Sequence, residues 1–177
     1  MPRIAAVDPA SASGRAKELF EGPLKGKHFN IFKSMAASPA VLDAYLAFSG
    51  ALGQGRLTTA ERELLQLAWA QARSCDYCLA AHTAIGKGSG LTEPQTVEAR
   101  KGRSQDAKHQ ALIAFALALH EKKGLVSDAE LATFKKAGYA DADVAEVVAN
   151  YAMATFTNYF NHVNATPVDF PAAPALS

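Results

Sequence analysis

The sequence predicts an all-α fold, because helix-start signals recur along the chain and no segment shows the strict alternation that is typical of a strand. In a capping box, Ser or Thr is followed three positions later by Glu or Gln. The chain has three such pairs, which are Thr58 with Glu61, Thr92 with Gln95, and Ser127 with Glu130. Pro39, directly after Ser38, marks a further helix start, because proline is favoured in the first turn of a helix.

The expected helices follow from these signals and from the apolar positions between them. We expect helices over residues 15–20, 28–35, 39–52, 58–73, 105–123 and 141–163. Another should start at residue 75 and end near residue 86 or 88, and two more should open after Thr92 and Ser127. Ser74 is the expected cap of the helix that starts at the first cysteine. Residues before 15 are expected to be an extended arm, and residues 165–177 an irregular tail that contains three prolines. No linker divides the chain, so residues 1–177 are expected to form one domain.

Composition narrows the class of protein. The chain has 177 residues, of which 49% are hydrophobic and 20% charged, as in ordinary soluble globular proteins with a real core. The net charge is +1 and the basic residues are spread along the chain, which argues against a nucleic acid or membrane-surface partner. No apolar run reaches about 18 residues, and the first residues lack the apolar core of a signal peptide. We therefore expect a cytoplasmic protein.

The two cysteines, Cys75 and Cys78, are the first sign of chemistry. A pair three positions apart in a reducing compartment indicates redox chemistry or metal binding, although cysteine is also a common core residue. With His82 the pair could hold zinc, and Glu63 or Asp76 would be the fourth ligand. Spacing alone leaves redox, metal and inert core readings open.

Residues around the pair favour the redox reading. Cys78 and His82 are four positions apart and Cys75 is one turn further back, so all three share one face of a helix. Free N–H groups and the dipole at the start of that helix stabilise a thiolate. A thiolate cleaves a peroxide bond, and Glu63 with His82 can serve as its proton relay. Glu63 reaches this face only if its helix packs beside the cysteine helix.

The spacing Glu-x11-Cys-x-x-Cys-x-x-x-His, formed by Glu63, Cys75, Cys78 and His82, resembles the signature of the alkylhydroperoxidase D (AhpD)-like branch of the carboxymuconolactone decarboxylase superfamily. Residues 36–90 carry most of the resemblance. The segment from Thr157 to Pro171 resembles that of a subgroup called peroxidase-related.

The resemblance implies an AhpD-like helical bundle that forms a homo-oligomer, either a trimer or a hexamer, and uses no metal or organic cofactor. It implies a thiol-dependent peroxidase that reduces hydrogen peroxide or small organic hydroperoxides. Cys78 would be the peroxidatic thiol, Cys75 the resolving thiol, and Glu63 with His82 the proton relay. The reductant would be a dithiol partner, either a lipoylated or a thioredoxin-like protein.

Two further residues are candidates for substrate contact or for support of the site. Tyr77 stands where the best-studied members carry a histidine directly before the second cysteine. His162 lies in a polar cluster near the end of the last expected helix. Two alternative functions stay open. One is a protein disulfide oxidoreductase or redox sensor, and the other is a decarboxylase-type lyase, although such lyases generally lack the paired cysteines.

Overall fold

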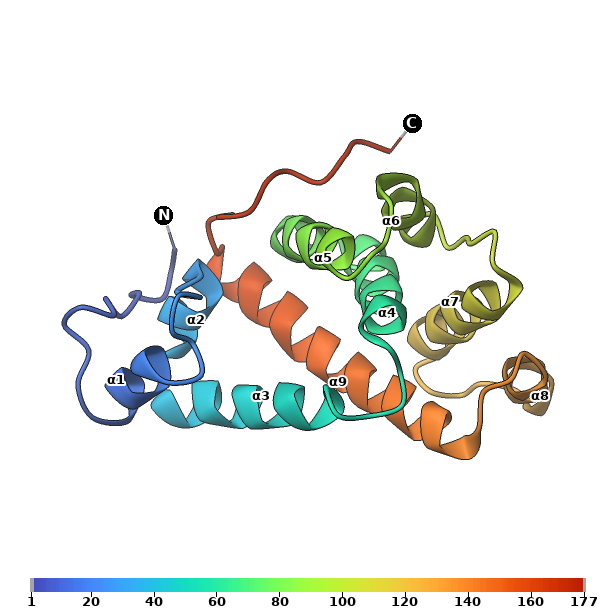
Figure 1. Cartoon of the computed structure of the whole chain (residues 1–177), viewed down its shortest axis with the longest axis horizontal. Coiled ribbons are helices and arrows are strands. Elements are labelled where there is room, and N and C mark those ends of the chain that lie inside the picture. The colour runs from blue at the N-terminus through green and yellow to red at the C-terminus, as the bar shows by residue number, and fades with distance from the viewer. Residues whose placement is uncertain (1, 177) are drawn as a thin grey trace.

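Nine helices make up the secondary structure of the computed structural model, which describes residues 2–176, and that part of the chain contains no strand (Figure 1). The predicted all-α class is therefore confirmed. The helices are α1 (Gly14–Glu21), α2 (Asn30–Met35), α3 (Pro39–Leu52), α4 (Thr59–Ala72), α5 (Asp76–Gly88), α6 (Glu93–Arg100), α7 (Ala107–Glu121), α8 (Asp128–Lys136) and α9 (Asp141–Asn164).

Helix α4 lies at the centre, where it packs against α5, α6, α7 and α9. Its side chains are buried on nearly every side, and Leu65, Leu67 and Trp69 are wholly inaccessible to solvent. Trp69 Nε1 donates a hydrogen bond to the Ala116 carbonyl on α7 at 2.9 Å, so its one polar atom has a partner. A helix that is buried all round gives the residues it carries fixed positions.

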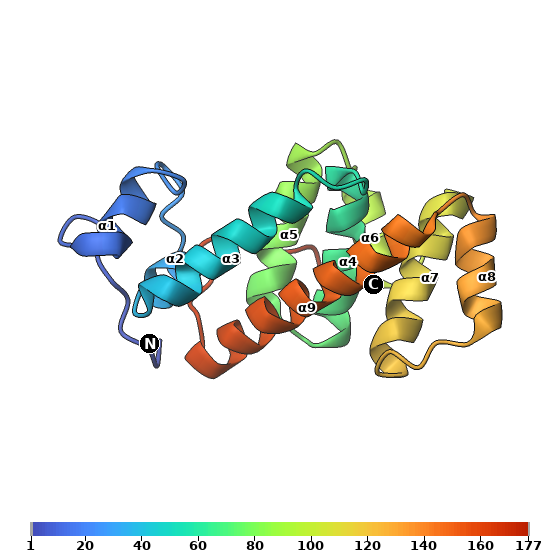
Figure 2. The ribbon, with the colours of Figure 1, turned by 90° about the horizontal axis from the view of Figure 1, so that it is seen from below.

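Helix α9 is the longest helix and crosses the molecule from the α8 end to the α2 end (Figure 1). It runs beside α3, as Figure 2 shows from below, and it also contacts α4, α5 and α7. The tail after α9 then passes over α5 toward α6 (Figure 1). Arg100 holds the tail there, because its Nη1 donates to the Pro174 carbonyl at 2.5 Å.

The three predicted capping boxes are all present at the starts of α4, α6 and α8. The predicted cap at Ser74 is wrong by one position, because Cys75 is the N-cap of α5. The Cys75 amide donates to the Ala70 carbonyl at 2.9 Å, and this tight reversal places Ser74 in the left-handed region with φ of 54°. Because Cys75 is the N-cap, it lies just before the first turn of α5 and not within it.

None of the helices within residues 2–176 combines the length and the apolar character that a membrane span needs.

Candidate active site

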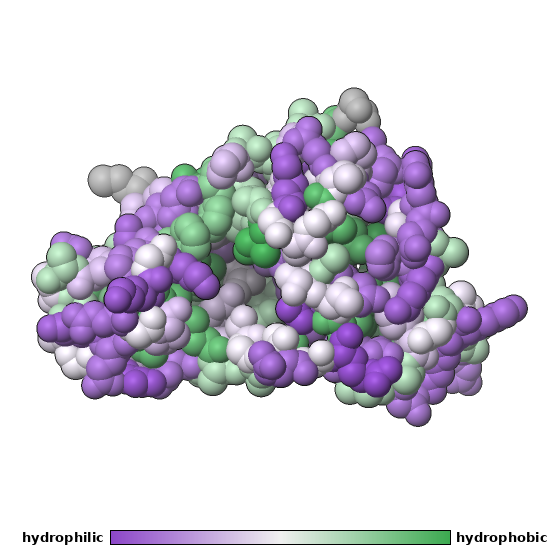
Figure 3. All heavy atoms as spheres, in the orientation of Figure 1, coloured by the Kyte–Doolittle hydropathy of each residue, from purple (hydrophilic) through white to green (hydrophobic). Residues whose placement is uncertain are grey.

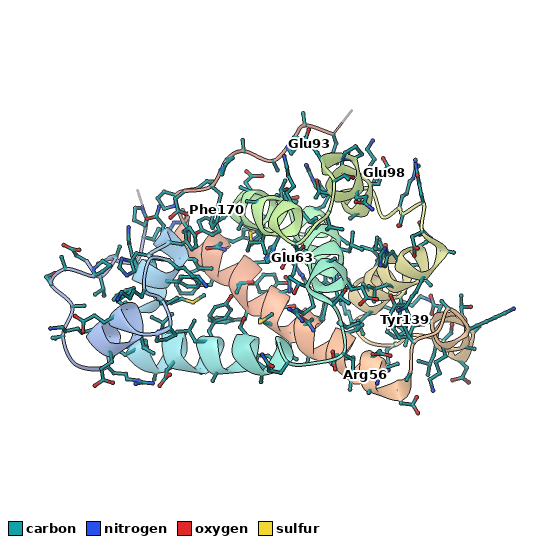
Figure 4. All side chains as sticks on the ribbon, viewed as in Figure 1. Arg56, Glu63, Glu93, Glu98, Tyr139 and Phe170 are labelled. Atoms are coloured by element: carbon teal, nitrogen blue, oxygen red, sulfur yellow. A yellow bond between two sulfur atoms is a disulfide. The ribbon has the colours of Figure 1, made fainter. Side chains whose placement is uncertain are left out.

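The packing of α4 against α5 brings Glu63 to His82. His82 Nδ1 donates to Glu63 Oε2 at 2.7 Å, and the two side chains are only 20% and 10% exposed. Figure 4 shows Glu63 on the side of α4 that faces α5. The condition set by the sequence, that the two helices lie side by side, is met. Because the carboxylate fixes the proton on Nδ1, it leaves His82 Nε2 as a hydrogen-bond acceptor.

Cys75 and Cys78 lie at the start of α5 and are joined in a disulfide, with their Cα atoms 5.3 Å apart. Cys75 Sγ also accepts a hydrogen bond from the Cys78 amide at 3.4 Å, as an N-cap side chain does. Both residues are almost completely buried, at 1% and 2% exposure. The pair can therefore be oxidised within one helix turn, without a second chain.

Helix α9 supplies two polar contacts to Cys78 that the sequence did not predict. Asn158 Nδ2 and Asn161 Nδ2 donate to Cys78 Sγ at 3.0 and 3.3 Å. Both asparagines are buried, and Asn161 Oδ1 has no hydrogen-bond partner within the described residues. The signal that was available is their spacing of three, which places two amides on the buried face of a helix.

A cavity of about 440 Å³ opens beside Cys78. Five aromatic side chains line it, which are Phe29, Phe32, Tyr45, Tyr77 and Phe170. Its polar wall includes Cys78, His82 and Asn161. Figure 3 shows a hollow with hydrophobic residues at its rim, between the positions that α2 and α5 occupy in Figure 1. The site thus places a sulfur and an imidazole, among other polar groups, beside an aromatic surface that suits a molecule with an apolar body.

Tyr77 is part of the cavity wall and anchors the C-terminal tail. Its hydroxyl donates to Asp169 Oδ1 at 2.8 Å and accepts from the Ile31 amide at 3.4 Å. Burial, followed by the hydrogen bond to Asp169, raises the pKa of Tyr77, so the phenol stays protonated at neutral pH. Its ring meets Phe170 edge-on, with 5.7 Å between the ring centroids. Figure 4 shows Phe170 on the tail, near the start of α5.

His162, the other supporting candidate, is not brought to the site. It is exposed on α9 and does not line the cavity. Its neighbour Asn161 takes that place instead, because one position along a helix turns a side chain by about 100°. Across residues 2–176, no three His, Cys, Asp or Glu side chains are grouped so that they could hold a metal ion.

Residues 39–121 match the model of the carboxymuconolactone decarboxylase family. This range contains Glu63, both cysteines and His82, but it ends before α9. A comparison with curated protein sequences finds no match.

Several solved structures have the same fold. One is an uncharacterized peroxidase-related protein from Ralstonia eutropha JMP134, described as an alkylhydroperoxidase AhpD core, with a TM-score of 0.85 and 22% identity over 95% of this chain and 92% of that one. Another is an uncharacterized peroxidase-related protein from Silicibacter sp. TM1040, with a TM-score of 0.78 and 20% identity over 93% and 92%. A third is the debrominase Bmp8 in complex with 2,3,4-tribromopyrrole, with a TM-score of 0.78 and 16% identity over 94% and 91%.

Proposed function

We propose that the chain is a thiol-dependent peroxidase that reduces hydrogen peroxide or small organic hydroperoxides, because residues 39–121 match the carboxymuconolactone decarboxylase family model and the fold is similar to that of an alkylhydroperoxidase AhpD core. The observation that carries the proposal is the hydrogen-bonded Glu63–His82 pair, since His82 lines the same cavity as Cys78. A thiol, a base and a group that orients the base are the parts that an activated sulfur nucleophile needs.

In the first step, His82 takes the proton of the Cys78 thiol, and Glu63 stabilises the imidazolium that forms. The thiolate attacks the terminal oxygen of the hydroperoxide, and the O–O bond breaks as the S–O bond forms. His82 returns the proton to the leaving alkoxide, so the products are an alcohol and a sulfenic acid on Cys78.

In the second step, the Cys75 thiol condenses with the sulfenic acid and releases water, which gives the disulfide. An external dithiol then supplies two electrons and two protons to restore both thiols. Cys78 lines the cavity, so a thiol that enters there attacks Cys78 and releases Cys75. A slender dithiol, such as the arm of a lipoylated partner, fits this route.

The burial of both sulfurs favours a small substrate over a folded protein. A protein disulfide oxidoreductase presents its sulfur to a partner surface, whereas both cysteine residues here are at most 2% exposed. The aromatic lining of the cavity suits an organic hydroperoxide with an apolar body.

Turnover of hydroperoxide tests the proposal. The reduced protein is supplied with dithiothreitol and with hydrogen peroxide or cumene hydroperoxide, and peroxide loss is followed against dithiothreitol alone. We expect catalysis by the wild type, none by Cys78→Ser, and at most slow turnover by Cys75→Ser. A wild-type rate equal to that of free thiol overturns the proposal. If the protein then still exchanges disulfides with a peptide, the disulfide oxidoreductase alternative takes its place.

A further inference from the structure

The two sulfurs of the pair have different surroundings. Cys78 Sγ accepts two side-chain amide N–H groups, one from Asn158 and one from Asn161. Cys75 Sγ accepts only the backbone N–H of Cys78 among the described residues. Hydrogen bonds from neutral donors strengthen when the acceptor is charged, so the two amides favour a thiolate at Cys78 over one at Cys75.

A guanidinium lies behind one of these amides. Arg73 Nη1 donates to Asn158 Oδ1 at 3.2 Å, and its Nη2 donates to Thr155 Oγ1 at 2.9 Å. Its charged carbon lies 4.6 Å from the centre of the Tyr151 ring. Within residues 2–176, no carboxylate forms an ion pair with this guanidinium. The positive charge of Arg73 therefore acts on Asn158 without a counter-charge at its side.

The Arg73 contact also fixes which way the Asn158 amide points. Because the guanidinium can only donate, it holds Oδ1 toward itself and leaves Nδ2 for the sulfur. A positive group on the oxygen of an amide polarises its N–H, and chains of hydrogen bonds strengthen one another in a buried site. Two hydrogen bonds in series therefore connect the Arg73 guanidinium, through the Asn158 amide, to Cys78 Sγ.

We propose that Asn158 and Asn161, with Arg73 behind Asn158, bind the Cys78 thiolate and so make Cys78, rather than Cys75, the reacting sulfur of the pair. This inference rests on the proposed peroxidase function only for what the thiolate does. The thiolate would form at Cys78 whether or not the protein reduces peroxides. Asn158 and Asn161 touch the reacting atom, whereas Arg73 is a positioning residue that acts through Asn158.

Other groups around Cys78 act on the same thiol. They are Cys75, Tyr77 and His82 on or next to α5, Glu63 on α4, and Tyr45 and Lys27 on the cavity wall. Every variant in a test must therefore share one background for these groups, so that a difference in the reactivity of Cys78 is due to the amides or to Arg73.

Alkylation of Cys78 by iodoacetamide as a function of pH is such a test. The Cys75→Ser background leaves Cys78 as the only thiol, and serine is a good N-cap, so α5 keeps its start. Asn158→Leu and Asn161→Leu each keep the branched shape and the number of side-chain heavy atoms but remove every polar atom, so neither adds a charge beside the sulfur. We expect each to raise the pH midpoint of alkylation by about one pH unit, which is tenfold less thiolate at lower pH.

Two more variants separate a local effect from a loss of structure. Arg73→Met should raise the midpoint by a smaller amount, and Arg73→Lys should restore part of that shift, because it returns the charge. Asn164→Ala is the matched control, since Asn164 lies one turn further along α9 but donates to Ser34 Oγ and Thr166 Oγ1 instead of sulfur. Its midpoint should equal that of the background protein.

Unchanged midpoints in both Asn158→Leu and Asn161→Leu overturn the inference, and so does an equal shift in Asn164→Ala. Alkylation uses no peroxide, so its outcome is separate from that of the proposed function. A protein with shifted midpoints and no peroxide turnover keeps the thiolate site and loses the peroxidase. If the protein turns over peroxide but the midpoints do not shift, the peroxidase function stands and the thiolate site is overturned.

Discussion

Replacing Glu63 by glutamine should slow peroxide reduction by about 5–30-fold. Glutamine can still accept from His82 Nδ1, but it carries no charge to stabilise the imidazolium. At 2.7 Å the bond has the length of a charge-assisted hydrogen bond, and both side chains are mostly buried, so solvent screens it little. Hydrogen bonds to charged groups are worth about 1.5–3 kcal/mol and neutral ones about 0.5–1.5 kcal/mol. The difference of about 1–2 kcal/mol corresponds to the stated change in rate.

The assay is kcat/KM for cumene hydroperoxide at saturating dithiothreitol, with the thermal midpoint measured for each variant. Glu93→Gln is the matched control, because Glu93 is an exposed carboxylate that pairs with Lys87 at 3.0 Å on the surface. It should keep the wild-type rate. A Glu63→Gln rate within twofold of wild type, or an equal loss in Glu93→Gln, would refute the reasoning.

Three further changes test the packing and the electrostatics. Leu112→Ala should lower the free energy of unfolding in urea by about 2–5 kcal/mol, whereas Leu125→Ala, at an 84% exposed site, should change it by less than about 0.5 kcal/mol; similar losses would contradict this. Tyr77→Phe should cost about 1–2 kcal/mol, and a double-mutant cycle with Asp169→Asn should show strong coupling; additive losses would mean that the hydrogen bond contributes little. Burial raises the pKa of Glu61, but the hydrogen bonds that it accepts outweigh burial and hold the pKa below 4.5. This part of the stability is therefore present above pH 4.5 and lost in acid, so Glu61→Gln should flatten the fall of the urea midpoint below pH 4.5, and an unchanged slope would contradict this.

Helix starts that depend on neighbouring residues could be predicted from the sequence. The capping boxes at Thr58, Thr92 and Ser127 close hydrogen bonds within three positions, so the pattern contains its own partners. The sequence predicts that α2 starts at residue 28, whereas the helix starts two residues later, at Asn30. Its amide is bound by Asp169 Oδ2 at 2.7 Å, from 139 positions away, and no local pattern can show that partner.

The residues of the candidate site also fall into those that a local sequence pattern predicts and those that only the tertiary packing brings together. Glu63 and His82 lie 19 positions apart on consecutive helices, so one motif contains both. Asn158 and Asn161 are 80 and 83 positions from Cys78, and only the packing of α9 against α5 brings them to the sulfur. The C-terminal polar cluster was visible in the sequence, but the face of α9 that turns inward was not. His162 was therefore favoured over the asparagines that reach Cys78.

Trapping the sulfenic acid with dimedone tests most directly whether Cys78 is the sulfur that reacts with peroxide. Each single-cysteine variant is reduced, treated with one equivalent of hydroperoxide in the presence of dimedone, and mapped by peptide mass spectrometry. Cys75→Ser should give an adduct on Cys78, because no second thiol can resolve the sulfenic acid. Cys78→Ser should give little adduct on Cys75. An adduct that forms on Cys75 at a similar rate, or the absence of an adduct in both variants, would contradict the role of Cys78 as the reacting sulfur.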